Sequence, residues 1–323
     1  MKKMSLVIPL YNESAVIGRL FTSLRDAMAA QPAYTWEAVF VDDGSADGTA
    51  EHVCAQHGLL PANVRLIRLS RNFGHQAALT AGIAAASGDA VICMDADLQD
   101  PPELLSEFVR RYEEGYEIVY AVRSARDAAP LKRAAYHLFY RLFQRVAEIP
   151  MPLDAGDFGL MSRRVARLVA EMPERDIFLR GLRSWVGFRQ VGIPYARPER
   201  IAGETKYSLT RLLKLAASAF FGFSFLPLRL ATSLGFVTVL LSLMYSAFAL
   251  TAALLYHSAP RGWASVIAVV SLMGGAQLIC IGILGEYIGR IYKQTQARPL
   301  YIVAEDVMLD PSSTEPPAPS RLA

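Results

Sequence analysis

Cysteine is scarce in this sequence. Only Cys54, Cys93 and Cys280 occur among 323 residues, and their spacing fits neither a disulfide framework nor a zinc-ligand set. Scarce, unpaired thiols are typical of a reducing compartment. The apolar run 6–10 near the N-terminus is too short for the core of a signal peptide. We therefore expect the front of the chain to stay in the cytosol.

Two common nucleotide-binding fingerprints are also missing. No Gly-x-Gly-x-x-Gly follows the first predicted strand, and the chain has no Walker motif. The first absence removes the main fingerprint of dinucleotide-dependent oxidoreductases. The second removes the simplest kinase or ATPase interpretation.

Charged residues are absent from two long stretches, 230–256 and 262–285. Each stretch exceeds the roughly 20 residues that cross the apolar core of a bilayer. The whole chain is 53% hydrophobic and 20% charged with a mean hydropathy of +0.25, which is more apolar than most soluble enzymes. We therefore predict a transmembrane hairpin over 230–292, with spans at about 230–256 and 263–286.

Positive charges flank this hairpin on its outer sides and predict its orientation. Cytosolic flanks of membrane spans carry an excess of Lys and Arg. We expect both termini in the cytosol, with a C-terminal tail over 293–323 that its Pro- and Ser-rich composition leaves disordered from about 310. The flanking cations are Arg229, Arg290, Lys293 and Arg298.

The remaining charges are unevenly distributed. Residues 1–122 carry 9 Lys and Arg against 16 Asp and Glu, whereas residues 123–229 carry 19 against 9. Within the basic part, 130–147 and 206–228 combine cationic residues with apolar side chains at helical spacing. Helices of this kind bind anionic membrane surfaces, although an ordinary core-packing helix fits 130–147 equally well. We predict that 130–229 is a region of its own with two interfacial helices.

The pattern of residues 1–129 predicts a parallel α/β sheet. Short β-branched runs alternate there with segments of helical length. Ligands of such sheets bind beyond the carboxyl ends of the strands. The predicted strands cover 5–9, 38–41, 64–69, 90–94 and 117–122.

Carboxylates recur at these predicted strand ends. Asp42 and Asp43 close one strand, and Asp95 and Asp97 follow another. Two carboxylates on one turn can hold Mg²⁺, which proteins bind with one or two carboxylates plus ligand phosphates. One pair could then meet the sugar and base of a nucleotide, and the other the metal and diphosphate. Solvated turns rich in Asp remain the alternative.

Several segments together resemble one family, the family 2 glycosyltransferases of the polyprenyl-phosphate type. That group includes dolichol-phosphate mannose synthases, bactoprenol glucosyltransferases and undecaprenyl-phosphate aminoarabinose transferases. The resemblance covers about residues 4–303 and implies a GT-A, Rossmann-like α/β domain for a nucleotide sugar, interfacial amphipathic helices and a C-terminal two-helix transmembrane hairpin. The segments are Leu6-Val-Ile-Pro-Leu-Tyr-Asn-Glu13, Val41-Asp-Asp-Gly-Ser45, Ser70-Arg-Asn-Phe-Gly74, Asp95-Ala-Asp-Leu-Gln-Asp-Pro-Pro-Glu103 and Gly203-Glu-Thr-Lys-Tyr-Ser208.

The resemblance also implies the residues of the donor site. The metal, Mg²⁺ or Mn²⁺, corresponds to Asp95 and Asp97, and the diphosphate contacts include Gln99. The pocket for the nucleotide base and ribose corresponds to Pro9, Tyr11, Glu13, Asp42 and Asp43.

The acceptor side follows from the same resemblance. Asp97 and Asp157 correspond to catalytic positions, and Asp157 corresponds to one that faces the transferred sugar. A phosphate monoester, with a second pKa near 6, already presents an anionic oxygen at neutral pH, so Asp157 is either a base or a positioning residue. Four basic residues correspond to positions that bind the lipid phosphate and the leaving diphosphate: Arg123, Arg133, Arg200 and Lys206. For each arginine the alternative is a surface cation that contacts only anionic lipid headgroups.

The implied reaction transfers a hexose from a nucleotide sugar to undecaprenyl phosphate, with inversion, at the cytosolic leaflet of a bacterial inner membrane. UDP-glucose is the donor that the resemblance favours. Formamido-arabinose, N-acetylglucosamine, galactose and mannose remain open as the sugar. The resemblance implies homo-oligomers, with a flippase and a second glycosyltransferase as downstream partners, and no nucleic acid.

Two other functions compete with this one. A processive polysaccharide synthase needs a Gln-x-x-Arg-Trp segment, and only the stretch 180–185 comes near it. A membrane sensor or transporter component fits poorly, because two spans with almost no buried polar residues make a poor translocation path and the metal carboxylates are intact.

Overall fold

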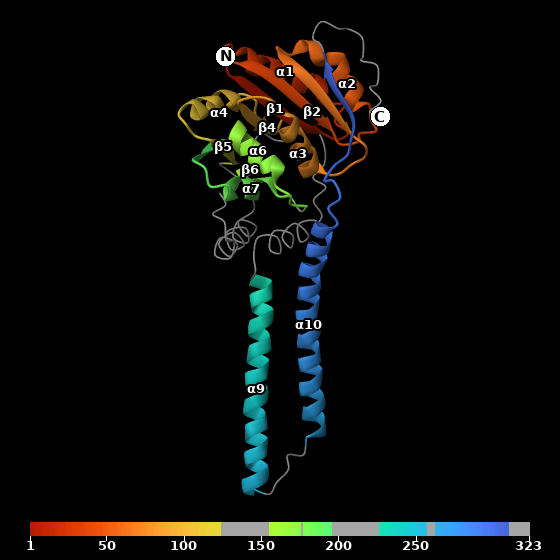
Figure 1. The fold of residues 1–323 in the computed structure, drawn as a ribbon, viewed down its shortest axis with the longest axis vertical. Helices are drawn as coiled ribbons and strands as arrows, with labels where there is room; N and C mark the ends of the chain where they lie inside the picture. The colour runs from red at the N-terminus through yellow and green to blue at the C-terminus, as the bar shows by residue number, and fades with distance from the viewer. Residues whose placement is uncertain (124–154, 176, 196–225, 257–261, 310–323) are drawn as a thin grey trace. The chain divides into compact units, whose positions relative to one another are not determined.

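One mixed sheet of eight strands joins the front, the middle and the C-terminal part of the chain (Figure 1). The computed structural model describes residues 1–123, 155–175, 177–195, 226–256 and 262–309. The strand order is β7-β5-β6-β4-β1-β2-β3-β8. The strands are β1 (Lys3–Leu10), β2 (Thr35–Asp42), β3 (Ala62–Leu69), β4 (Ala90–Cys93), β5 (Ile118–Arg123), β6 (Ala155–Ser162), β7 (Gln190–Tyr195) and β8 (Val303–Leu309).

Strand direction decides which loops meet. β1 runs parallel to β2 and β4, β2 runs parallel to β3, and β5 runs parallel to β7. β6 is antiparallel to both of its neighbours, β4 and β5, and β8 is antiparallel to β3. The amino end of β6 therefore lies at the same edge of the sheet as the carboxyl ends of β4 and β5.

Helices cover both faces of the sheet, which explains why its strands are apolar almost throughout. In β1, Leu6 and Ile8 pack into one hydrophobic cluster and Val7 into the other. The first cluster includes α1 (Ile17–Ala29), α2 (Thr49–Gln56) and α4 (Leu104–Glu113), and a short 3₁₀ turn at His57–Leu59 follows α2. The second includes α3 (His75–Ala85), α6 (Arg163–Glu171) and α7 (Leu179–Trp185). This arrangement confirms the predicted Rossmann-like α/β fold class.

Small residues bring α3 close to the centre of the sheet. A Cβ atom at Gly82 would lie 2.3 Å from Cγ1 of Val7 and 3.0 Å from Cγ2 of Val41. Only glycine fits at that distance, because real Cβ atoms do not approach other atoms so closely. Gly82 therefore allows α3 to pack directly against β1 and β2.

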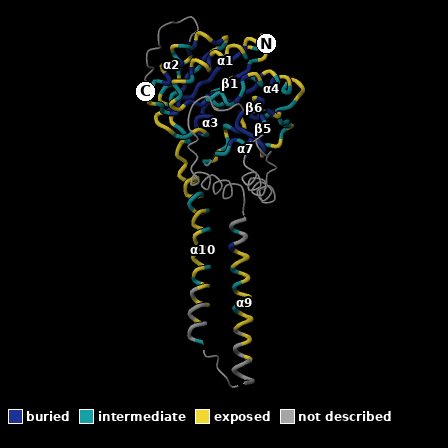
Figure 2. Tube along the Cα trace, turned by 180° about the vertical axis from the view of Figure 1, so that it is seen from behind, coloured by how far each residue is buried: buried dark blue, intermediate teal, exposed yellow. Residues whose placement is uncertain are grey.

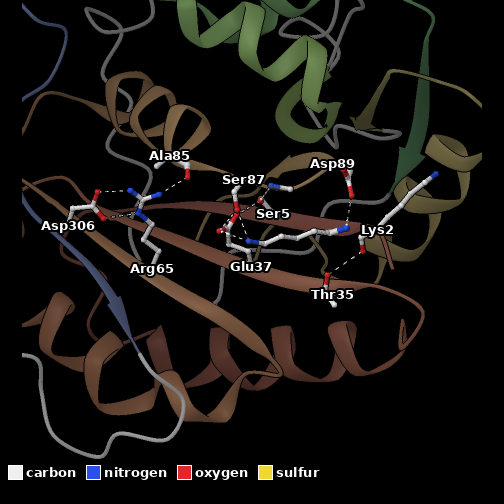
Figure 3. A network of polar contacts seen from close by, with 11 residues as sticks. Lys2, Ser5, Thr35, Glu37, Arg65, Ala85, Ser87, Asp89 and Asp306 are labelled. Atoms are coloured by element: carbon white, nitrogen blue, oxygen red, sulfur yellow. Dashed lines mark hydrogen bonds and ion pairs between the residues drawn. The ribbon is translucent and has the colours of Figure 1, made fainter.

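A buried polar network joins the amino ends of β1, β2 and β4 (Figure 3). Glu37 of β2 is 2% exposed and accepts hydrogen bonds from Ser5, from the backbone and hydroxyl of Ser87 (2.9 and 2.8 Å) and from Lys3 Nζ (3.0 Å). The Ser5 hydroxyl also accepts from the Gly88 backbone at 2.8 Å. Every one of these contacts satisfies a polar group that water cannot reach.

Residues that the sequence analysis placed in 130–229 contribute to the same sheet. β6, α6, α7 and β7 all lie between 155 and 195 and pack into its two clusters. The predicted interfacial helix 130–147 lies outside the described residues, as does 206–225 of the second one. The tail beyond 309 also lies outside them.

Sequence reasoning also missed β8, which lies inside the predicted tail. β8 pairs with β3 along its whole length, and its acidic side chains meet two arginines of that strand. Arg65 donates to both Asp306 oxygens at 2.7 and 2.6 Å, and Arg68 donates to Glu305 at 3.2 Å. The chain therefore returns to the sheet after its last helix.

The two long helices α9 (Leu226–Tyr256) and α10 (Trp263–Thr295) belong to a second compact unit. They pack antiparallel, since Cys280 Sγ approaches the Ala231 carbonyl at 3.6 Å and the Ser242 hydroxyl approaches Met273 Sδ at 3.5 Å. Most of their described side chains are exposed, as the yellow stretches in Figure 2 show. Among the described residues, Leu272–Thr295 is long and apolar enough to cross a membrane, whereas the apolar stretch Ala231–Tyr245 is shorter.

The buried network around Glu37 generates a stability prediction with a definite pH dependence. Burial alone would raise the pKa of Glu37, but the hydrogen bonds from Ser5, Ser87 and Lys3 lower it below the ordinary value of 4.5. The network therefore stabilises the fold fully above about pH 4.5, and this contribution is lost as the pH falls through the lowered pKa. We expect Glu37→Gln to cost about 1–3 kcal/mol at pH 7 and clearly less near pH 3.

Thermal unfolding at the two pH values, followed by the fluorescence of buried Trp36, measures this difference. Glu113→Gln is the matched control, because Glu113 pairs with Lys2 at 2.8 Å on the surface, where such pairs contribute at most about 1 kcal/mol. A Glu37→Gln effect no larger than the control effect would show that the network does not hold the strands together.

Candidate active site

The loops after β1 and β2 are joined to each other by hydrogen bonds. The backbone of Asn12, which adopts a positive φ of 54°, donates to the Ser45 hydroxyl at 2.9 Å. The Asn12 side chain in turn accepts from the Ala46 backbone at 2.9 Å, and the Glu13 backbone donates to the Thr49 hydroxyl at 2.9 Å. These contacts hold the two loops together at the carboxyl ends of β1 and β2, where the Tyr11 side chain is half exposed.

Asp43 fixes the next loop, between β3 and α3. Its two carboxylate oxygens accept from the backbone N–H groups of Phe73 at 2.7 Å and Gly74 at 2.9 Å. Burial raises the pKa of this carboxyl, and the two N–H groups offset part of the rise. Asp43 therefore anchors the first turn of α3, in addition to the predicted contact with a nucleotide, which stays a prediction.

Its neighbour Asp42 is equally buried but is held differently. One oxygen accepts from the Ser45 backbone at 3.0 Å, and Arg68 Nε stands 3.6 Å from the other. Pro9 lies opposite Val41 in the register of β1 and β2, so it shares this part of the edge.

The centre of the edge brings Asp95 and Asp157 together. Cys93 of β4 pairs with Gly159 of β6, and continuing this antiparallel register by two residues places Asp95 opposite Asp157. His75, at the start of α3, stands between them: its Nε2 is 3.4 Å from Asp95 Oδ1 and 3.7 Å from Asp157 Oδ2. Two carboxylates that are 62 residues apart in the sequence thus belong to one site.

Asp157 is surrounded by donors. Arg180 Nε donates to its Oδ1 at 3.1 Å, and Gln76 Nε2 donates to its Oδ2 at 3.0 Å. Burial alone would raise the pKa of this carboxyl, but the His75 ring and the charge of Arg180 hold it well below its usual range. Asp157 is therefore an ionised, hydrogen-bonded group rather than a ready proton acceptor.

Asp95 has the opposite electrostatics. Burial raises its pKa to about 6; His75 opposes this rise, whereas the nearby Asp100, Asp157 and Asp97 add to it. Repulsion among these carboxylates leaves a site that favours a cation. Asp97 follows on the same turn, where Leu98 adopts a φ of 57° and the Gln99 backbone donates to Asp97 at 3.1 Å.

The donor set on this turn fits a metal that completes its shell with ligand oxygens. In the part of the chain that the structure describes, no three His, Cys, Asp or Glu side chains form a ready-made metal site. Asp95 and Asp97 can supply two carboxylates, which is what Mg²⁺ takes when phosphates and water provide the rest.

Arg123 reaches the same edge from the end of β5. It pairs in register with Tyr195 of β7, whose hydroxyl donates to the buried Asp100 at 2.9 Å. Arg123 Nε is buried and has no hydrogen-bond partner among the described residues. Of the other predicted basic contacts, Arg133, Arg200 and Lys206 lie outside the described residues.

Sequence reasoning did not find His75 and Gln76. The only signal for them was Gly74 before a helical stretch, in the segment Ser70-Arg-Asn-Phe-Gly74, which marks a helix start but says nothing about what its first side chains touch.

Comparison with protein families gives two matches. Residues 5–169 match the family described as glycosyl transferase family 2, and residues 226–291 match the GtrB C-terminal hairpin. The first match covers β1 to β6 with every described carboxylate of the site, and the second covers α9 and most of α10.

Several curated proteins are similar over nearly their whole length. An uncharacterized glycosyltransferase, YkcC of Bacillus subtilis, is 44% identical over 300 residues, covering 93% of this chain and 92% of that protein. The bactoprenol glucosyl transferase of Shigella phage SfV is 39% identical over 305 residues, covering 94% and 99%. A prophage bactoprenol glucosyl transferase homolog of Escherichia coli is also 39% identical, covering 93% and 98%.

Solved structures are more distant. The mannosyltransferase PcManGT from Pyrobaculum calidifontis, in complex with GDP-Man and Mn²⁺, matches with a TM-score of 0.44 at 16% identity, covering 92% of this chain and 86% of that chain. TarS of S. aureus in complex with UDP-GlcNAc matches with a TM-score of 0.43 at 17% identity, covering 68% and 67%. Both values are too low for an argument about the site.

The different contacts of Asp42 and Asp43 generate a prediction about the stability of the site. We expect Asp43→Asn to cost about 1–3 kcal/mol, because an amide nitrogen cannot accept from a backbone N–H and one buried donor loses its partner. Asp42→Asn should cost clearly less, since an amide oxygen still accepts from Ser45, and Arg68 keeps its contact with Glu305. Thermal unfolding of both variants, compared with the unaltered chain, measures the difference; equal losses would contradict the anchoring role of Asp43.

Proposed function

This chain belongs to glycosyl transferase family 2, and from that premise we propose that it transfers glucose from UDP-glucose to undecaprenyl phosphate, with inversion, at the cytosolic face of a bacterial inner membrane. The observation that carries the proposal is the combination in one chain of the Asp95–Asp157 site with a GtrB-type hairpin. Relatives that are 39% identical over more than 90% of this chain are named bactoprenol glucosyl transferase and prophage bactoprenol glucosyl transferase homolog.

The donor side depends on the turn after β4. A divalent cation on Asp95 and Asp97, Mg²⁺ or Mn²⁺, would supply charge stabilisation for the departing diphosphate. The chain itself contributes the rigid frame: Asp43 holds the start of α3, and the joined loops after β1 and β2 support Tyr11 and Glu13 at the predicted base and ribose pocket. No protein acid is needed, because a nucleoside diphosphate leaves as an anion.

The acceptor side explains why Asp157 can remain ionised and hydrogen-bonded. A lipid phosphate presents an anionic oxygen at neutral pH, so attack on the anomeric carbon requires no general base. Asp157 therefore serves to orient Arg180 and His75 near the reacting groups. We assign Arg123 to the acceptor phosphate or the leaving diphosphate, because its buried Nε has no hydrogen-bond partner among the described residues.

Membrane anchoring follows from α9 and α10. Phe236, Leu272 and Leu278 are each more than 70% exposed, which water would not tolerate along two long helices but lipid would. We propose that both helices span the membrane, that both termini are cytosolic and that the basic segments around them rest on anionic headgroups.

The donor prediction is tested with the full chain in detergent or nanodiscs. Incubation with Mg²⁺, undecaprenyl phosphate and a panel of radiolabelled nucleotide sugars should move the label of UDP-glucose into the organic phase. Label from N-acetylglucosamine, galactose, mannose or formamido-arabinose instead would replace the sugar but keep the acceptor. Transfer of no label to the lipid phosphate would contradict the proposed function.

The metal site gives a second prediction. We expect Asp97→Asn to lower turnover about 100-fold or more, because the diphosphate loses charge stabilisation at the point where its negative charge develops. Chelation of divalent cations should lower the turnover of the unaltered chain similarly, and added Mg²⁺ should restore it.

Asp26→Asn is the matched control for this variant. Asp26 is an exposed aspartate of α1, and its carboxylate pairs with the neighbouring Arg25 at 2.9 Å and with no other cation of the described residues. Its turnover should stay within twofold of the unaltered chain. Full activity of Asp97→Asn, or activity that survives chelation, would remove the metal from the proposed mechanism.

A further inference from the structure

Gln76 connects three elements that are far apart in the sequence. It lies in the first turn of α3, and both ends of its carboxamide are used. Its Nε2 donates to Asp157 Oδ2 of β6 at 3.0 Å, and its Oε1 accepts from the Leu179 backbone N–H of α7 at 2.9 Å. The orientation of the amide is determined by these partners, since a carboxylate only accepts and a backbone N–H only donates.

The contact with Leu179 replaces a missing helix cap. Leu179 is the first residue of α7, and Phe178 before it provides no side-chain hydrogen bond to the helix start. The first N–H groups of a helix need partners from outside the helix. Here Gln76 of α3 supplies the partner of the Leu179 N–H, so it helps to fix the beginning of α7.

The residue after Leu179 closes a ring of contacts. Arg180 Nε donates to Asp157 Oδ1 at 3.1 Å and its Nη2 donates to Oδ2 at 3.4 Å, the oxygen that Gln76 also contacts. The ring therefore runs from Gln76 to Asp157, from there to Arg180, and along the backbone of α7 back to Gln76. Asp157 cannot turn away without breaking its contacts with both Gln76 and Arg180, and Arg180 cannot turn away without breaking its contacts with Asp157.

Exposure separates the roles within the ring. Asp157 is 8% exposed and Gln76 is partly exposed, whereas the Arg180 side chain is 37% exposed, so Arg180 is the most accessible member of the ring. Its guanidinium is a suitable partner for a phosphate oxygen, because it is planar and always charged. Both substrates of the proposed reaction carry such oxygens, at the nucleoside diphosphate and at the lipid phosphate.

We propose that Gln76 is a positioning residue of this site: through the start of α7 and through Asp157, it holds Arg180 where the guanidinium meets a phosphate oxygen of a substrate. Gln76 does not itself touch the substrate. The inference rests on the proposed function, because it assigns Gln76 a part in the transfer reaction.

A double-mutant cycle tests this role in the full chain. Gln76→Ala should lower kcat about 10- to 100-fold, since a displacement of an ångström at a catalytic group has effects of this size. Arg180→Lys keeps the charge but loses the planar fork and should lower kcat similarly. The double variant should be no more than about threefold slower than the slower single variant, because both changes remove the same contact.

Thr80→Ala is the matched control on the same helix. Thr80 lies one turn further along α3, and its hydroxyl donates to the Gln76 carbonyl at 2.8 Å, within the helix. Its kcat should stay within about twofold of the unaltered chain. A loss equal to that of Gln76→Ala would show that α3 responds to any weakening and would overturn the positioning role.

Gln76→Glu keeps the prediction testable if the alanine variant folds poorly. The glutamate has the same length and still accepts from Leu179, but it cannot donate to Asp157 and places a second carboxylate beside it. With a melting temperature near that of the unaltered chain, it should lose at least 10-fold in kcat. Unchanged kcat in this variant, or multiplicative losses in the cycle, would contradict the proposal.

The outcomes also separate this inference from the proposed function. If the unaltered chain transfers sugar to lipid phosphate but the cycle is multiplicative, only the role of Gln76 fails. If the unaltered chain transfers no sugar, the proposed function fails. The affinity of the single and double variants for UDP, measured by calorimetry, then replaces kcat in the double-mutant cycle. There the double variant should bind UDP as weakly as the weaker single variant, and independent losses would overturn the proposal.

Discussion

The antiparallel insertion of β6 between β4 and β5 is the constraint on which the site depends. β6 runs opposite to β4 and β5, so its amino end lies beside their carboxyl ends, and Asp157 comes to lie opposite Asp95. Gly159 permits this pairing, because a Cβ there would lie 2.5 Å from the Val119 carbonyl oxygen of β5. Two carboxylates that would repel each other are thereby held at one edge, and the surrounding groups decide what each of them can do.

The surrounding groups give the two carboxylates different pKa values. Arg180, Gln76 and His75 surround Asp157 with donors, and the His75 ring and the charge of Arg180 lower the pKa of its carboxyl. In the proposed mechanism Asp157 orients its neighbours and does not accept a proton. Burial and, to a smaller extent, the neighbouring carboxylates raise the pKa of Asp95, and the repulsion among these carboxylates favours a bound cation. This difference fits a transfer in which the leaving diphosphate needs charge stabilisation and the attacking phosphate needs no base.

Much of this arrangement was predictable from the sequence, because it depends on local patterns. The β-branched runs gave β1 to β5, the strand ends gave the carboxylates, and the charge-free stretches gave α9 and α10. β6 escaped because Gly156 and Gly159 weaken its strand signal, and β8 escaped because it lies beyond the last helix. The contacts of Gln76 join residues 81 and 103 positions away, and no spacing rule reports such distances.

The most direct test of the account is a structure of the full chain with UDP and Mn²⁺, in which anomalous scattering locates the metal. We expect one peak within coordination distance of Asp95 and Asp97, with the diphosphate bound beside it and Asp157 still hydrogen-bonded to Arg180. A metal and nucleotide bound elsewhere, with no ligand at the turn after β4, would contradict it.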